Sequence, residues 1–438
     1  MYWYIEEYIP ILVFIFILTF LIFRCLTERI RISEFDSLGV LNITVTFSVV
    51  LLFSFFLGEY INLQQLIQIL TLIFSFYLGI YLVSMYFKPS LKRGRRKEVL
   101  ELFAYDNLKN INLVMMFVCN SLIGVLFAIL LLKKYGSPDE RLLVAKSNRA
   151  IDIIRIGISS VLPYYAVGLY LLTKKKIYLA FIFLLTVIGF FSGSKGFLLQ
   201  YIVTYFTLDG LINGKRDIKF YIRRSFLFFI FIASAVLVKI FWGATTQVAL
   251  MDILNRILAS GDIYYFSFII GDYTQLFGEY NLIYYILHPF TSIIGIRGYE
   301  FPIGALILST AGREVVGTGP NPHLPILSLI LAKGVYLFSL FFSFLAGCFV
   351  CISRIVAINF IAKRKIPPYW RIAFFSIFFD YVSHLYIDIG YFEFVLIGTF
   401  VVTVIFSVFY EFILGLRYKR REPILTMHSD PREFCGGD

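Results

Sequence analysis

Long apolar stretches follow one another along most of this chain, and short polar segments separate them. A helix needs about 20 apolar residues to cross a membrane, and about eleven stretches approach that length. Their approximate limits are Tyr8–Phe23, Leu38–Phe56, Leu66–Tyr86, Ile111–Leu132, Ile153–Thr173, Ile177–Phe191, Gly196–Ile212, Ser225–Trp242, Leu327–Ser353, Ile372–Ile389 and Phe392–Leu414. The pattern predicts an all-α polytopic membrane protein with about eleven transmembrane helices.

One interval is too long to be an ordinary connection between spans. Residues 243–325 separate the eighth and ninth predicted spans, whereas most other segments on the same side are short. Long inserted loops are often functional, and this one holds Arg256, Arg297, Arg313, His288 and His323. We therefore expect a single membrane domain over residues 1–438, with one large extracytoplasmic loop inserted between spans 8 and 9.

The composition excludes a soluble fold and sets the orientation. Charged residues make up 16% of the chain, against about 25% in soluble domains. Of the 40 Lys and Arg residues, 28 lie in alternate inter-span segments, which are Arg24–Arg31, Lys88–Lys109, Lys174–Lys176, Lys215–Arg224, Arg354–Arg371 and Arg417–Arg432. Basic residues accumulate in cytoplasmic segments, so we expect the N-terminus outside, the C-terminus in the cytoplasm and the long loop outside. The net charge of +12 is then mostly a topology signal, and no nucleic-acid partner is expected.

The five cysteines predict neither a disulfide framework nor a metal site. None lies in the long loop, and Cys348 and Cys351 form a CxxC pattern inside the ninth predicted span. An apolar helix offers no further ligands at that place. We expect no metal.

Three ionisable residues follow one another at spacings of four in the tenth predicted span, Asp380, His384 and Asp388. In a continuous α-helix this spacing places them on one face. Charges inside a membrane are costly and are either paired or functional. The stripe is therefore either a clamp between helices, with Arg155 or Lys239 as a partner, or the wall of a polar cavity or proton path.

A turn between the sixth and seventh spans has the features of an anion site. The residues Phe191-Ser192-Gly193-Ser194-Lys195-Gly196 precede a helix on the outer face, so free backbone N–H groups, the Ser194 hydroxyl and the Lys195 ammonium converge. A tight turn that needs glycine is the simpler alternative. Arg155, near the outer end of the fifth span, either extends to the membrane surface or contacts a phosphate there.

The run Gly317-Thr318-Gly319-Pro320-Asn321-Pro322-His323-Leu324 holds an imidazole where the ninth span begins, and Gly334 follows eleven residues later. Together with the multispan topology, the Ser-Gly-Ser-basic-Gly turn and the arginine-rich outer loop, this run resembles the O-antigen polymerase and ligase superfamily. Within it, the length and the absence of a clear His-Asn pair favour the Wzy-type polymerases of oligosaccharide repeat units. The resemblance covers most of the chain by topology and about a dozen residues by motif.

The resemblance implies a bacterial inner-membrane, metal-independent glycosyltransferase without a cofactor. Its substrates would be undecaprenyl-diphosphate-linked oligosaccharides, and the growing glycan would be transferred to an incoming repeat on the outer face, for O-antigen or a related surface polysaccharide. By the same resemblance, Lys195 would contact the donor diphosphate, Arg297 or Arg313 would neutralise the leaving group, and His323 would be the general base. A chain-length regulator, a flippase and membrane lipids would be its partners.

The chemistry is consistent with these roles on general grounds. Displacing a lipid diphosphate from an anomeric carbon requires positive charge on the departing oxygens and a base for the acceptor hydroxyl. Besides His323, the loop offers four further base candidates, Asp272, Glu279, Glu300 and Glu314. The main alternative is a lipid-linked oligosaccharide flippase or polysaccharide transporter, whose path the tenth span would line. A different lipid-linked glycosyltransferase and a non-catalytic assembly partner rank below it.

Overall fold

The computed structural model describes residues 8–87, 96–104, 108–130, 149–191, 197–214, 218–224, 261–277, 303–313, 320–363 and 365–425, with scattered positions in 226–247 and at 285 and 287. Every regular element in this described part is helical. In chain order the elements are α1 (Ile9–Thr27), α2 (Ser37–Leu57), α3 (Leu63–Phe87), α4 (Arg96–Ala104), α5 (Leu108–Leu130), α7 (Arg149–Thr173), α8 (Lys176–Phe191), α9 (Phe197–Asn213), α10 (Ile218–Arg224), α13 (Asp262–Tyr265), η4 (Phe266–Ile270), η5 (Tyr273–Leu276), α15 (Ile303–Thr310), α16 (Leu324–Leu331), α17 (Tyr336–Ile361), α18 (Pro368–Phe375), η6 (Ser376–Asp380), η7 (Tyr381–Leu385) and α19 (Ile389–Leu425).

Six helices in the described residues are long and apolar enough to cross a membrane, namely α1, α2, α3, α7, α17 and α19. Shorter apolar stretches lie in α5 and α8. A polytopic α-helical membrane protein is therefore confirmed. The count of eleven spans stays a prediction, because most of the eighth expected span and most of the 243–325 loop lie outside the described residues.

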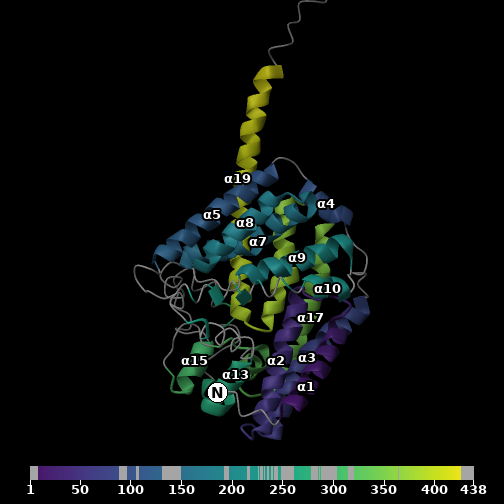
Figure 1. Ribbon diagram of the computed structural model, residues 1–438, viewed down its shortest axis with the longest axis vertical. Coiled ribbons are helices and arrows are strands. Elements are labelled where there is room, and N and C mark those ends of the chain that lie inside the picture. The colour runs from purple at the N-terminus through teal and green to yellow at the C-terminus, as the bar shows by residue number, and fades with distance from the viewer. Residues whose placement is uncertain are drawn as a thin grey trace, which may run out of the picture.

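The helices form two packed groups. The N-terminal group consists of α1, α2, α3 and α17, and the other of α5, α7, α8, α9 and α19, with separate cores of buried apolar side chains. In Figure 1 the purple N-terminal helices lie beside α17, and the teal helices occupy the other half of the bundle, while α19 runs through it and beyond. The described loop elements α13 and α15 lie at one end of the bundle and α4 lies at the other (Figure 1).

Small residues let helices approach closely in both groups. A side chain at Gly347 of α17 would overlap the carbonyl oxygen of Phe76 in α3, and one at Gly79 would overlap that of Phe344. Gly157 of α7 meets Gly398 of α19 in the same way. Lipid gives no hydrophobic force between helices, so such backbone contact is a main source of helix association in membranes.

The ninth predicted span, Leu327–Ser353, is wrong as a single helix. The apolar run is divided into α16 and α17 by a turn in which Lys333 and Gly334 have φ values of 52° and 76°. Gly334 therefore serves a left-handed turn that favours glycine. All eight residues of α16 are buried, so this short helix is part of the core rather than half of a lipid-facing span.

The residues Arg354 and Asp36 form a fully buried ion pair, with both side chains 0% exposed. Nη2 of Arg354 lies 2.7 Å from Oδ2 of Asp36. Its Nη1 donates to Ser37 Oγ at 2.9 Å and to the carbonyl of Phe379 at 2.8 Å. The assignment of Arg354 to a cytoplasmic loop was therefore wrong, because this guanidinium joins α17 to the start of α2 and to η6 inside the bundle.

Candidate functional site

The tenth predicted span is not a continuous α-helix. Its chain follows α18 to Phe375, a π-helical turn in η6, a 3-10 turn in η7, and then α19 from Ile389. The expectation that Asp380, His384 and Asp388 share one helix face is therefore wrong. The π-helical and 3-10 turns change the number of residues per turn, so a spacing of four no longer marks one face here.

Asp380 fits the clamp between helices, with Tyr164 and Thr207 as partners. The expected partner Arg155 pairs with Asp152 instead, and Lys239 lies outside the described residues. Asp380 is 2% exposed. The hydroxyl of Tyr164 in α7 donates to its Oδ2, and that of Thr207 in α9 donates to Oδ1 at 3.5 Å. Two helices are thus tied to η6 by one carboxylate. The neighbouring Phe379 carbonyl is held by Arg354, so η6 is fixed on both sides.

His384 and Asp388 lie where the chain turns from η7 into α19, and three further residues join them there. The imidazole of His384 lies 5.3 Å from the ring of Tyr381 and 5.4 Å from that of Tyr391, between ring centroids. Asp388 Oδ1 accepts the Tyr391 backbone N–H at 3.2 Å, so it caps the first turn of α19. We call Tyr381, His384, Asp388, Tyr391 and Glu393 the turn cluster.

Glu393 was not singled out from the sequence, although it is a carboxylate inside the eleventh predicted span. It is 8% exposed, and its Oε2 has no hydrogen-bond partner among the described residues. An acidic residue inside a predicted span was the available signal, because intramembrane charges are rare and functional by default.

The long loop reaches the turn cluster through Tyr285, which sequence reasoning also missed. A methyl group placed on Gly390 would lie 3.3 Å from Asp388 Oδ1 and 3.7 Å from the Tyr285 hydroxyl. The side chains of Asp388 and Tyr285 thus border the same space beside Gly390. The cluster lies between loop and bundle, with groups that accept protons, donate hydrogen bonds and offer ring faces.

His323 lies inside the core, at the N-cap of α16, and is 2% exposed. Its ring lies between Tyr264 of α13 and Tyr386, at 5.9 and 5.7 Å between centroids. Burial lowers the pKa of His323 to about 4, so the imidazole is neutral at pH 7. Its Nδ1 has no hydrogen-bond partner in the described part of the chain.

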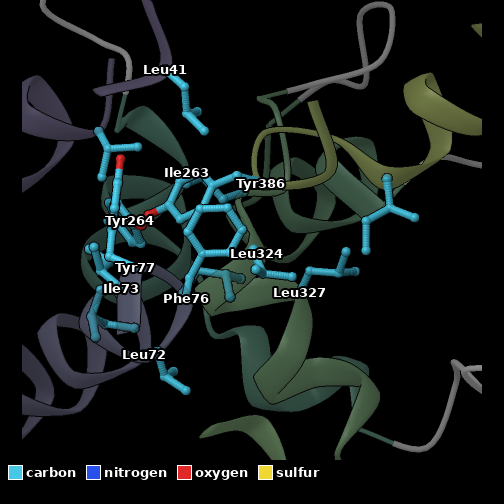
Figure 2. Close-up of a cluster of buried hydrophobic side chains, with 14 of the residues drawn as sticks. Leu41, Leu72, Ile73, Phe76, Tyr77, Ile263, Tyr264, Leu324, Leu327 and Tyr386 are labelled. Carbon is cyan, nitrogen blue, oxygen red and sulfur yellow. The ribbon is translucent and has the colours of Figure 1, made fainter. Parts of the chain in front are cut away.

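Tyr386 connects the start of α16 to the middle of α3. The Leu324 N–H donates to the Tyr386 carbonyl at 2.8 Å, and the Tyr386 ring lies 5.0 Å from that of Phe76. Figure 2 shows Tyr77, Tyr264 and Tyr386 meeting in this core together with Leu324. Tyr386 directly follows η7, so the His323 environment and the turn cluster are adjacent along one short segment.

Arg155 was expected either to extend to the membrane surface or to contact a phosphate, but in the structure it pairs with Asp152. Its Nε and Nη2 donate to Asp152 Oδ1 at 2.9 and 2.7 Å, one helical turn earlier in α7. The Arg155 side chain is 15% exposed and that of Asp152 is 19% exposed. A phosphate at this guanidinium would have to share it with an existing carboxylate.

Of the other basic residues predicted to bind the substrate diphosphate, only Arg313 lies in a described segment. Arg313 is exposed in the turn after α15, where its N–H donates to the Leu308 carbonyl at 3.0 Å. Ser194, Lys195 and Arg297 lie outside the described residues, as do Arg256 and His288. Helix α9, which follows the Ser194–Lys195 turn, begins at Phe197.

Among the alternative base candidates, Asp272 has a structural role. Its Oδ1 accepts from the Thr274 N–H at 2.9 Å and from the Thr274 hydroxyl at 2.6 Å, which caps η5. Glu279, Glu300 and Glu314 lie outside the described residues. Within the residues that the structure describes, no three His, Cys, Asp or Glu side chains are grouped to hold a metal ion.

Comparison of the chain with family models, curated proteins and solved structures finds no match.

Proposed function

We propose that this protein polymerises undecaprenyl-diphosphate-linked oligosaccharide repeat units, as a metal-independent glycosyltransferase of O-antigen or related surface polysaccharide synthesis in the bacterial inner membrane. The supporting observation is the turn cluster. It brings an imidazole, a carboxylate and tyrosine rings to the turn before α19, where Asp388 and Tyr285 of the long loop border one space, and the second carboxylate, Glu393, follows in the first turns of α19. Transfer to a sugar hydroxyl needs a proton acceptor next to ring faces and hydrogen-bonding groups.

A groove on the lipid-facing side supports a lipid-linked substrate. It lies between α1, α3 and α17, has a volume of about 1230 Å³, and is lined mainly by apolar side chains such as Phe74, Leu78 and Phe341. Phe76 of α3 contacts Tyr386 on the opposite side of the helix. A prenyl chain in this groove would be separated from the Tyr386 turn by the width of one helix.

A flippase or polysaccharide transporter is the second candidate function, and one feature favours it. The elements α16, η6 and η7 are short or irregular helices inside the bundle. Broken helices near mid-membrane are typical of transporter sites. The two candidates differ in whether a glycosidic bond is formed.

Reconstituted protein distinguishes them. Purified protein in liposomes would receive undecaprenyl-diphosphate repeat units, and the length of the product would be followed on a gel. We expect a ladder of polymers, which K195Q should reduce about 100-fold through loss of charge at the diphosphate. The control is K333Q, which removes an exposed lysine in the α16–α17 turn and should leave the ladder unchanged. Movement of intact substrate between leaflets without a ladder would instead favour the flippase. If neither a ladder nor movement of substrate were observed, both candidate functions would be ruled out.

A further inference from the structure

We propose that Glu393 is the general base that takes the proton of the acceptor sugar hydroxyl, in the segment that also carries Asp388 and His384. This inference rests on the polymerase function proposed above and names a catalytic residue of its site. It differs from the role that the resemblance implies for His323.

Glu393 lacks the partners that other buried carboxylates have among the described residues. Asp36 is paired with Arg354 and also accepts the Ile32 and Gly39 N–H groups at 2.9 Å each. Asp380 accepts from Tyr164 and Thr207. Glu393 is 8% exposed, and no hydrogen bond or ion pair to it is found within the described residues. A buried polar group without a partner is costly, so its retention indicates a ligand or a reaction.

Two further ionisable residues precede Glu393 in the segment that leads into the same helix. Asp388 lies at the cap of α19, five residues before Glu393, where its Oδ1 accepts the Tyr391 N–H. His384 is fixed between the rings of Tyr381 and Tyr391. Pairs of carboxyl groups recur in acid–base chemistry on sugars.

His323 fits the role of base less well than Glu393. The imidazole is 2% exposed and is enclosed by Tyr264 and Tyr386 inside the core. The turn cluster has one exposed member, because Tyr391 is 39% exposed, and Gly390 borders the space shared with Tyr285 of the loop. A sugar that enters between loop and bundle therefore meets the turn cluster before His323.

The step balances without a cofactor. The acceptor hydroxyl oxygen forms a bond to the anomeric carbon of the donor, and its proton passes to the Glu393 carboxylate. The bond from the anomeric carbon to the diphosphate oxygen breaks, and its electron pair leaves with the lipid diphosphate. Glu393 then returns the proton to water, which restores the base.

The test is the pH dependence of polymerisation by wild type and by E393Q, in the same liposomes. We expect E393Q to elute as folded protein and to lose about 10²- to 10⁴-fold in kcat with little change in KM. The wild-type rate should fall at acidic pH, and this fall should be absent from the residual E393Q rate. E393D, which keeps the carboxylate but shortens its reach, should retain the acidic fall at a rate reduced about tenfold. The control is E59Q, an exposed glutamate in the turn between α2 and α3, which should behave as wild type.

The outcomes are distinct. A wild-type ladder together with an unchanged E393Q rate, a full E393D rate, or the same acidic fall in E393Q would overturn the assignment of Glu393 alone. If E393Q does not fold, E393D decides by the same criteria. A wild type that forms no ladder would overturn the proposed function and this inference together.

Discussion

Replacement of Arg354 by leucine is expected to prevent accumulation of folded protein. The variant leaves Asp36 buried without a counter-charge, and it also removes the hydrogen bonds to Ser37 and to the Phe379 carbonyl. Breaking a buried ion pair by removing one partner costs about 3–5 kcal/mol. The readouts are the yield of monodisperse protein in detergent and its melting temperature.

Two further variants separate charge from packing. The double variant R354M/D36N removes both charges but keeps an acceptor at the N-cap of α2, so it should recover much of the lost stability. R24L removes a partly exposed ion pair with Glu34, where the Arg24 side chain is 42% exposed, and should cost less than about 1 kcal/mol. A wild-type melting temperature in R354L would contradict the structural role of this pair.

The second large effect is expected at the crossing of α3 and α17. In G347L a side chain would occupy the place of the Phe76 carbonyl, so the two helices would have to separate. Overpacking of this kind costs about 3 kcal/mol. Phe76 also contacts Tyr386, so polymer formation should be lost together with folded protein.

L345F is the matched control for that crossing. Leu345 lies two residues away on the same helix and is 45% exposed, so the added volume points to lipid and should leave the melting temperature unchanged. Equal stability of G347L and L345F would show that α3 and α17 do not pack through their glycines.

The length of the apolar stretches was enough to predict several of the regular helices. The expected spans Ile111–Leu132, Ile153–Thr173, Ile177–Phe191 and Gly196–Ile212 agree with α5, α7, α8 and α9 to within a few residues. It could not divide α16 from α17, because the residues on both sides of the turn are equally apolar. Lys333-Gly334 was the only local signal of that turn, and a lysine at a span end is also a common interfacial anchor.

The candidate site was only partly predictable. The spacing of four between Asp380, His384 and Asp388 indicated one helix face, but η6 and η7 interrupt the α-helix over this segment. The pairing of Arg354 with Asp36 joins residues 318 positions apart, so no local pattern could show it. Hydropathy averages also conceal a single carboxylate such as Glu393 in an otherwise apolar helix.

The central claim is that the substrate binds at the turn cluster, between the long loop and the bundle. The most direct measurement is photo-cross-linking of a labelled lipid-linked repeat unit to protein that carries a benzophenone side chain at position 391 or, as a control, at position 86. Tyr86 is 82% exposed at the C-terminal end of α3, away from the cluster. We predict a labelled adduct at position 391 that unlabelled substrate suppresses, and none at position 86. Labelling at position 86 alone, or equal labelling at both positions that unlabelled substrate does not suppress, would contradict the claim.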